Sequence, residues 1–516
     1  MTGATLTPSL AAELIKDLTF SGTRTTTVIA PFTGKPLHEL PQASAQDVTD
    51  ATAAARVAQL AWRLAGPAHR RSVLLKAHDL LLARREELLD VLQSETGKTR
   101  GQAFEEVFQS ASVTRYYAVS AESVLKTRSR RGGIPAVFAA RVSYKPKGVI
   151  GIITPWNYPL SLALMDATPA LAAGNAVVMK ADNQGVLTVL AARRAFIDAG
   201  LPAALWPVVA GDGEEVGNAI TDTADYVCFT GSTATGTRVA TRAAARLIGS
   251  SMELGGKNPL IVLDDVDPAK AAADAVYACF SSMGQLCVSI ERLYVPASIA
   301  PAFTAAFVER VKALKQSAAF DFSSDIGSLT SAAQLRRVEE HVNDAIDKGA
   351  TLLAGGTARP DLGPFFYEPT VLTNVTADMM CSANETFGPV VAIHVVDSVD
   401  EAIITANSSD FGLNASIFAR SKQRARIVAD AIDAGSVNIN EGYRASFGSV
   451  DAPMGGMKKS GLGRRNGREG ILRFVEGRTV AESTGLLQLP RTGREWEKMV
   501  PVMLLLLASL KTVRRR

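Results

Sequence analysis

Residues 148–181 read GVIGIITPWNYPLSLALMDATPALAAGNAVVMKA, and this stretch decides the fold. The apolar run GVIGIITP predicts a buried strand, residues 161–173 predict a helix, and NAVVMKA predicts a second buried strand. Strands that are apolar throughout and alternate with helices are typical of a parallel sheet covered on both faces. The stretch therefore predicts an α/β protein.

The same alternation continues downstream. We expect helices at 187–200, 214–220 and 233–247, with the strands LWPVVAG and ADYVCFTG between them. A second α/β series begins at KNPLIVLDD and runs to about residue 440, with the strands RLYVP, ATLLAG, PVVAIHVV and GSVNIN. The chain is therefore predicted to fold as two tandem Rossmann-like α/β domains.

The region upstream has a different pattern. Residues 44–92 are rich in alanine, with apolar side chains at helical spacing, and Ser44 is a plausible helix cap. Residues 128–147 are basic at both ends and β-branched or apolar in between. We interpret this segment as an exposed hairpin arm inserted in the first domain.

Composition excludes several functional classes. The chain has 516 residues, a hydrophobic fraction of 47% and a net charge of only +4, so it has ample core and no sign of a nucleic-acid partner. Its four cysteines lack CxxC spacing, and its five histidines are scattered, which argues against disulfides and against a metal site. No signal-peptide pattern opens the chain, and we expect a cytoplasmic protein.

The C-terminal segment is unusual. Residues 499–510, MVPVMLLLLASL, are almost entirely apolar and are followed by KTVRRR. The apolar run is too short to cross a bilayer. Two interpretations stay open: the segment docks on this or a partner subunit, or it contacts an anionic membrane peripherally.

One thiol stands out in the stretch FSSMGQLCV, residues 280–288. A thiolate is a good nucleophile and, as a thioester, a good leaving group, so Cys287 is a candidate catalytic residue. Most intracellular cysteines merely pack as small apolar groups, and we assign that role to Cys228, Cys279 and Cys381.

A glycine-bearing turn is a candidate phosphate site. In ADYVCFTGSTATG, Gly231 would let the backbone approach a pyrophosphate, and Ser232 lies where a helix begins. The spacing from Gly231 to Gly236 is GxxxxG, which is neither the dinucleotide fingerprint GxGxxG nor a nucleotide-hydrolase loop. The nearby GDGEEVG, residues 211–217, is acidic at the helix start, so we interpret it as a turn and cap.

Three loops add polar side chains. In TPWNYP, prolines fix the loop of Asn157, whose amide suits an oxyanion hole or a structural turn. In MELGGKNP, an apolar setting would raise the pKa of Glu253 toward that of a general base, unless it is an ordinary surface residue. In NETFGPV, Glu385 suits a ribose and Phe387 a nicotinamide ring, unless the segment merely begins a strand.

The order of these motifs resembles the aldehyde dehydrogenase superfamily from about residue 25 to residue 480. The resemblance rests on PWN, KA, FTGS, ELGGKNP, GQ-x-C, E-x-FGPV and MGGMKKSG in this order, and on the offset from Glu253 to Cys287. It implies the aldehyde dehydrogenase fold and an oxidation of an aldehyde. Cys287 would be the nucleophile, Asn157 would help to hold the oxyanion, and Glu253 would activate water for thioester hydrolysis.

The resemblance also implies the cofactor site and the domain division. The cofactor-binding residues would be Trp156, Lys180, Asn183, Gly231, Ser232, Gly236, Glu385 and Phe387. The expected segments are a dinucleotide-binding domain, a catalytic domain, an oligomerisation arm and an apolar, basic tail. Their expected bounds are 1–127 with 148–256, then 257–455, then 128–147 with 470–490, and finally 491–516. A homodimer or a homotetramer is implied.

The departures from the family pattern bear on the cofactor. The ribose lysine is followed by KADN, so Asn183 stands where NAD-preferring members carry Glu. A neutral side chain there removes repulsion of a 2′-phosphate. We therefore expect NADP or NAD to be used, with NADP slightly favoured. Position 465 is Arg where many members have Glu, and we assign it no role.

The substrate expectation rests on resemblance to the succinate-semialdehyde dehydrogenases of actinobacteria. Ser281 stands where well-known members of that activity use an arginine to hold the substrate carboxylate. Arg444 and Ser449 could replace it.

Other interpretations of the site stay open. Tyr158 and Phe447 could instead line an apolar tunnel for a broad-specificity or lipophilic aldehyde dehydrogenase. A CoA-acylating relative and a catalytically silent scaffold on the same fold are further alternatives.

Overall fold

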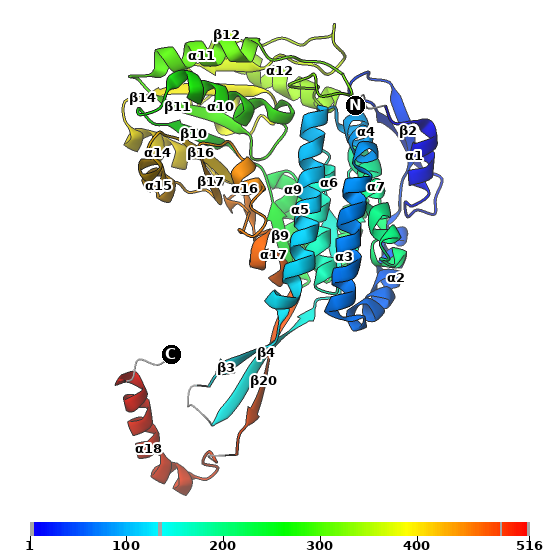
Figure 1. Ribbon diagram of the computed structural model, residues 1–516, viewed down its shortest axis with the longest axis vertical. Helices are drawn as coiled ribbons and strands as arrows, with labels where there is room; N and C mark the ends of the chain where they lie inside the picture. Colours follow the sequence, from blue (N-terminus) through cyan, green and yellow to red (C-terminus); the bar gives the residue numbers. More distant parts are fainter. Residues whose placement is uncertain (1–4, 133–136, 486–487, 513–516) are drawn as a thin grey trace.

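The computed structural model describes residues 5–132, 137–485 and 488–512. In these residues the chain forms two α/β units, a β arm that projects from them, and a C-terminal helix beyond the arm (Figure 1). The predicted α/β architecture is confirmed.

The first sheet has the strand order β19-β9-β8-β5-β6-β7. Its strands are β5 (Val149–Ile153), β6 (Ala176–Lys180), β7 (Val208–Val209), β8 (Tyr226–Thr230), β9 (Gly249–Glu253) and β19 (Gly461–Leu462). β5 lies between β6 and β8 and is parallel to both, and all five of its residues are buried. This agrees with the apolar run from which the sheet is predicted.

Helices cover this sheet, and α3, α5 and α6 pack side by side (Figure 1). The helices in this unit are α1 (Pro8–Ile15), α2 (Ala45–Leu64), α3 (Gly66–Ala83), α4 (Arg85–Thr96), α5 (Arg100–Leu125), α6 (Pro159–Ala172), α7 (Val186–Asp198), α8 (Glu215–Thr223), α9 (Thr233–Ala245) and α17 (Gly467–Leu472). Ser44 caps α2 by accepting from the Asp47 backbone N–H, as predicted. A hairpin of β1 (Thr25–Ile29) and β2 (Pro36–Pro41) and the short helices η1 (Asn183–Gly185) and η2 (Ala203–Leu205) complete the unit.

The second sheet has the order β12-β13-β14-β11-β10-β16-β17. Its strands are β10 (Asn258–Val262), β11 (Ile290–Pro296), β12 (Thr351–Ala354), β13 (Thr370–Thr373), β14 (Val390–Val396), β16 (Asn414–Phe418) and β17 (Ser436–Ile439). Its helices are α10 (Pro268–Phe280), η3 (Ser281–Gly284), α11 (Ala300–Lys312), α12 (Ala332–Asp347), α13 (Met380–Ala383), α14 (Val399–Asn407), α15 (Lys422–Asp430) and α16 (Arg444–Phe447). A small ladder joins β15 (Phe411–Gly412) to β18 (Met457–Lys458).

Both sheets are parallel, as expected, except at one edge strand each. β12 runs antiparallel to β13, and β19 runs antiparallel to β9. β19 is a return of the chain from beyond residue 455, and it pairs Gly461 with Glu253. Antiparallel edge strands on a mostly parallel sheet are common, because an edge needs no crossover helix. Here the edge strand supports the end of β9 from which Glu253 projects.

The arm is a three-stranded antiparallel sheet. β4 (Phe138–Pro146) lies between β3 (Arg128–Arg131) and β20 (Val475–Ser483). This confirms the hairpin predicted at 128–147, except for residues 133–136, which lie outside the described residues. α18 (Gly493–Thr512) follows β20 and stands apart from the two α/β units (Figure 1). Within the described residues, no helix has the length and apolarity needed to cross a membrane.

A buried ion cluster connects the first sheet to two arginines that lie just before and just after α17. Asp166 on α6 accepts from the Arg465 guanidinium at 2.9 and 2.6 Å and from the Arg473 guanidinium at its Oδ1. Arg473 also donates to Ser251 Oγ on β9 at 2.8 Å. The side chain of Asp166 is almost fully buried, so each charge relies on its partners for solvation.

We expect Asp166→Ala to destabilise the protein by about 3–5 kcal/mol, because it leaves two buried guanidinium groups without their carboxylate. The control is Asp222→Ala, which breaks the exposed Arg242–Asp222 pair and should cost no more than about 1 kcal/mol. Urea unfolding followed by circular dichroism measures both. Equal midpoints for the two variants would contradict the expected role of the cluster.

Candidate active site

A cavity of about 200 Å³ lies between the two α/β units. It is lined from both, because the loops after β5, β8 and β9 meet the loops of the second sheet there. Eight residues singled out from the sequence line this cavity: Trp156, Asn157, Gly231, Ser232, Glu253, Cys287, Glu385 and Phe387. Residues that are far apart in the chain thus come together around one thiol.

Cys287 lies in a turn just before β11. It is partly exposed, whereas Cys228, Cys279 and Cys381 are buried, as the sequence predicts for them. The preceding helix η3 contains non-helical residues in the left-handed region, with φ of 49° at Ser282 and 58° at Met283. Such conformations are strained for side chains other than glycine and often occur at functional loops.

Gly284 continues this left-handed run with φ of 67°. A Cβ at this position would lie 2.1 Å from the carbonyl oxygen of Gly388. Only glycine fits there, because the nucleophile loop passes directly against the loop that carries Phe387. The close approach brings Cys287 next to the part of the second sheet expected to hold a nicotinamide.

The Cys287 thiol is protonated at rest. Burial raises its pKa to about 12, and the nearby carboxyl groups of Glu385 and Glu253 add to this effect. A thiol reacts as a nucleophile only after it loses its proton, so the site needs a base.

Glu253 meets the requirements for that base. Burial raises its pKa to about 7, and the guanidinium of Arg465 limits the rise. Its Oε1 is buried and has no hydrogen-bond partner among the described residues. An unpaired buried carboxyl is costly unless it has a function. A group with a pKa near 7 can accept a proton and return it at neutral pH.

A buried pair positions Asn157. Lys98 Nζ donates to the Asn157 carbonyl at 2.8 Å and is paired with Glu106. Glu106 also accepts from the backbone N–H groups of Leu160 and Ser161 at 2.9 and 3.0 Å. It thereby caps α6, whose own N-cap residue provides no side-chain bond.

The amide of Asn157 is held from the other side as well. Its Nδ2 donates to the Gln285 carbonyl at 2.9 Å, two residues before the nucleophile. An amide nitrogen carries two N–H groups, so the second remains for an oxyanion. Lys98 and Glu106 were not singled out from the sequence, because charged residues in a helical pattern normally lie at the surface.

Glu385 and Phe387 are held by an acid that sequence analysis also missed. Glu291 on β11 accepts from the backbone N–H groups of Thr386 and Phe387 and is paired with Lys257. Glu385 accepts from the Gly256 N–H at 2.8 Å, and burial raises its pKa to about 8. The Phe387 ring meets the Trp156 ring edge-to-face at 5.5 Å.

A second cavity of about 550 Å³ adjoins the first, and Pro155, Trp156, Thr230 and Gly231 line both. Lys180 and Arg238 also line it, and α9 begins at its edge with Ser232 as N-cap. Gly236 does not line either cavity; a Cβ on it would lie 2.3 Å from Leu254, so it permits close packing of α9. The joined cavities and the helix N-terminus suit a dinucleotide.

Two sequence interpretations change at this cavity. Asn183 does not line it; its amide bonds to Gln42 and to the Gly211 N–H, and Asp182 takes the lining position. The segment interpreted as a mere turn and cap does line it, through Asp212, Gly213, Glu214 and Gly217. Asp212 still caps α8 by accepting from two backbone N–H groups, so the interpretation as a cap holds.

The candidate substrate residues divide into two groups. Tyr158 is buried, and its hydroxyl shares a hydrogen bond of 2.9 Å with Ser282 Oγ. The centroids of its ring and of the Phe447 ring lie 6.3 Å apart. Arg444 instead lines a separate cavity of about 380 Å³ together with Ser281.

That separate cavity is acidic as well as aromatic. Arg444 lies 4.0 Å over the Tyr277 ring and pairs with Glu441. Glu105 lines the cavity and accepts from the hydroxyl of Tyr443, which also bonds to Ser281. Ser449 is engaged with the Ala445 carbonyl at 2.6 Å and lines neither cavity. Tyr443 is a further residue that sequence analysis missed.

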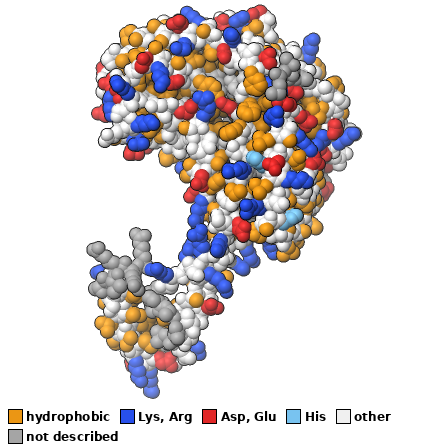
Figure 2. Space-filling model, viewed as in Figure 1, with side chains coloured by type: hydrophobic (Ala, Val, Ile, Leu, Met, Phe, Trp, Pro, Cys, Tyr) orange, Lys and Arg blue, Asp and Glu red, His pale blue; other side chains and the backbone are white. Residues whose placement is uncertain are grey.

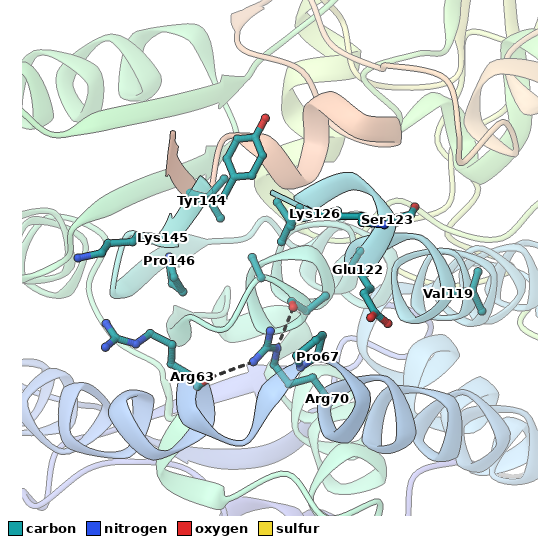
Figure 3. Close-up of a pocket in the computed structure, with 15 residues that line it drawn as sticks. Arg63, Pro67, Arg70, Val119, Glu122, Ser123, Lys126, Tyr144, Lys145 and Pro146 are labelled. Carbon is teal, nitrogen blue, oxygen red and sulfur yellow. Dashed lines mark hydrogen bonds between the residues drawn. The ribbon is translucent and has the colours of Figure 1, made fainter. Parts of the chain in front are cut away.

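The largest cavity described, about 780 Å³, lies elsewhere, where the arm leaves the body (Figure 3). It is lined by Arg63, Arg70, Lys126, Tyr144 and Lys145 among others. Arg70 on α3 donates to the Ala172 carbonyl and to the carbonyls of Trp62 and Arg63 at the end of α2. No cysteine is among its lining residues, whereas Cys287 lines the smaller cavity.

Comparison with curated proteins shows close relatives. A Mycobacterium tuberculosis protein with the provisional name succinate-semialdehyde dehydrogenase [NADP(+)] 2 is 50% identical over 467 residues, covering 90% of each chain. The mitochondrial succinate-semialdehyde dehydrogenase of Oryza sativa is 36% identical over 458 residues, covering 88% of this chain and 85% of that protein.

Solved structures agree. An Escherichia coli NADP-dependent enzyme superposes with a TM-score of 0.85 at 33% identity, covering 89% of this chain and 95% of that one. Betaine aldehyde dehydrogenase from Staphylococcus aureus in complex with NAD⁺ superposes with a TM-score of 0.87 at 31% identity, covering 94% of this chain and 99% of that one. The profile of the Aldehyde dehydrogenase family matches residues 19–480. The chain therefore belongs to the aldehyde dehydrogenase family.

Proposed function

We propose that the protein oxidises an aldehyde to a carboxylic acid, with NADP or NAD as hydride acceptor, through a covalent bond at Cys287. The observation that carries this proposal is the shared cavity, in which the partly exposed thiol of Cys287 and the unpaired carboxyl of Glu253 lie together. The Cys287 thiol needs a base to become a thiolate, and the carboxyl of Glu253, whose pKa is raised to about 7 by burial, lines the same cavity.

The chain's own residues account for each proton and bond. Glu253 takes the thiol proton as sulfur bonds to the aldehyde carbon, and the free N–H of Asn157 stabilises the oxyanion. When bound, the cofactor would supply the acceptor for the hydride of the same carbon, and the group left on Cys287 would be a thioester. Glu253 would pass the thiol proton to solvent and, as a carboxylate, remove a proton from the water that attacks the thioester. The C–S bond then breaks to release the carboxylic acid, and Glu253 returns its proton to the Cys287 thiolate.

The cofactor would extend through the two joined cavities. Glu385 would bind the nicotinamide ribose, Trp156 and Phe387 would flank the ring, and the start of α9 would meet the pyrophosphate. Lys180 and Arg238 line the adenosine end. The provisional NADP(+) names of the mycobacterial relatives support an NADP preference.

Succinate semialdehyde is the proposed substrate, and the names of the relatives support it. Arg444 is the candidate cation for its distal carboxylate. The alternative is a lipophilic or broad-specificity aldehyde, and it is favoured by the aromatic rings of Tyr158, Tyr443 and Phe447 behind the nucleophile loop. A CoA-acylating reaction and a silent scaffold fit less well, since Glu253 is placed to activate water.

We further propose that the protein works in the cytoplasm as a homodimer or homotetramer built through the arm. Two subunits would pair through this arm, because its edge strands β3 and β20 offer unpaired backbone groups. The domain division proposed is 1–127 with 148–256, then 257–455, with 128–147 and 470–490 as the arm. The tail, 491–516, would add a peripheral membrane contact.

Substitutions at the two catalytic candidates should remove the nucleophile in one variant and the base in the other. Cys287→Ser is expected to abolish both a first-turnover burst of reduced cofactor and steady-state turnover. Glu253→Gln should lower steady-state kcat about 10²-fold to 10⁴-fold and remove the rise of kcat through about pH 7, where the carboxyl loses its proton. Stopped-flow absorbance of NADPH measures both. Unimpaired turnover in Glu253→Gln would contradict its role as base.

The cofactor preference should depend on Arg238. We expect kcat/KM of the unmodified protein with NADP to equal or exceed that with NAD. Arg238→Gln should lower kcat/KM about tenfold to a hundredfold for NADP alone, since a charged hydrogen bond to the 2′-phosphate is lost. Arg242→Gln is the matched control, because Arg242 lines the same cavity but is neutralised by Asp222. A strong NAD preference of the unmodified protein would contradict the cofactor proposal.

The substrate carboxylate should depend on Arg444. We expect Arg444→Ala to raise KM for succinate semialdehyde about tenfold or more and to leave KM for hexanal unchanged. Arg424→Ala serves as control, because that arginine is equally exposed and pairs with Asp264 far from the site. Equal effects of Arg444→Ala on both aldehydes would favour the alternative of a lipophilic substrate.

A further inference from the structure

The apolar part of α18 has no polar face. Val500, Val502, Leu504, Leu505 and Leu507 are between 43% and 70% exposed. At about 100° per residue, these side chains point in several directions around the helix axis. Figure 2 shows the resulting apolar surface beyond the arm. Exposed apolar side chains on a soluble helix are normally confined to scattered positions.

The one remaining face of this part is apolar as well. Met499, Met503, Leu506 and Leu510 form a stripe at helical spacing and are half-buried. A helix that docks on a protein surface buries one such stripe and presents polar residues on its other faces. α18 does not follow this pattern between residues 499 and 510. A lipid phase, which would contact all faces of the helix, therefore fits this segment better than the surface of a second subunit, which would contact one face.

The dimensions indicate how deep the helix can enter a lipid phase. Twelve residues in helical conformation extend about 18 Å, well short of the roughly 30 Å hydrocarbon core of a bilayer. This agrees with the finding that no described helix is long and apolar enough to cross a membrane. A helix of this length lies in the interface or dips into one leaflet.

Both ends carry residues suited to the headgroup region. Trp496 precedes the apolar run and is 44% exposed, and indole side chains favour the boundary between water and lipid. Lys511 follows the run, and the sequence continues with arginine at positions 514, 515 and 516. Clustered cations next to an apolar helix attract anionic phospholipids.

The placement of α18 leaves the active site accessible. α18 lies beyond the far end of β20 and apart from the two α/β units between which the Cys287 cavity lies (Figure 1). It also lies outside residues 19–480, which match the family profile. Binding at α18 would therefore neither cover the cavity nor disturb the shared fold.

We propose that α18 is an interfacial anchor that inserts its apolar run into one leaflet of a membrane rich in anionic phospholipid. This inference deepens the membrane contact in the proposed function and is independent of the aldehyde chemistry, so each can fail without the other.

Flotation of the full-length protein with vesicles tests the anchor. We expect binding to vesicles of phosphatidylcholine with phosphatidylglycerol, and at least tenfold weaker binding of the combined variant Leu504→Gln, Leu505→Gln, Leu507→Gln. The matched control is Val57→Gln, Leu60→Gln, Leu64→Gln, since these α2 side chains are 53–79% exposed. The control should bind like the unmodified protein, and both variants should keep full dehydrogenase activity in buffer.

Two further readouts identify the chemistry of the contact. Lys511→Glu should weaken binding to the anionic vesicles severalfold and leave the weak binding to pure phosphatidylcholine vesicles unchanged. Tryptophan emission should shift to shorter wavelength on vesicle binding. Trp496→Phe should remove that shift, because Trp62 and Trp206 are buried in the fold and Trp156 lines the Cys287 cavity, away from α18.

Several outcomes would overturn the anchor. One is flotation of the combined leucine variant at the level of the unmodified protein, and another is equal loss in the α2 control. A third is the combination of two results: the unmodified protein does not float with vesicles, and the leucine substitutions split a larger oligomer in light scattering without vesicles. The helix would then be a contact between subunits. Loss of turnover with vesicle binding intact would count only against the proposed reaction.

Discussion

The buried pair of Lys98 and Glu106 is the contact on which the site most depends. One carboxylate caps α6 through two backbone N–H groups, and the lysine that balances it holds the carbonyl of Asn157. The loop after β5 is thus fixed at both its main chain and its side chain. Removal of either partner would leave the other buried without its counter-charge, so the site requires both.

Sequence patterns were sufficient for the α/β architecture and for the residues that line the candidate site. Apolar strands such as β5 are visible because burial on both faces demands continuous hydrophobic sequence. The combined order of motifs brought Cys287, Glu253 and Asn157 together correctly, and all three line one cavity. No single motif would have achieved this.

The supporting residues could not be predicted in the same way. Lys98, Glu106, Glu291 and Tyr443 act through contacts made across the fold, and a charged or phenolic side chain in a helix or strand carries no local sign of such a role. Asn183 shows the reverse error, since its position in a motif suggested a ribose contact, while the turn of η1 directs its amide to Gln42. Local backbone geometry decides which of two adjacent side chains faces a cavity.

The short link between α17 and β20 has a mechanical consequence. Arg473 donates to Asp166 on α6 and to Ser251 on β9 of the first sheet, and β20 begins two residues later. Asn175 also donates to the carbonyl of the intervening Phe474. The arm therefore begins directly beside the ion cluster, which contacts β9 two residues before Glu253, so a displacement of the arm would reach the candidate base through Arg473.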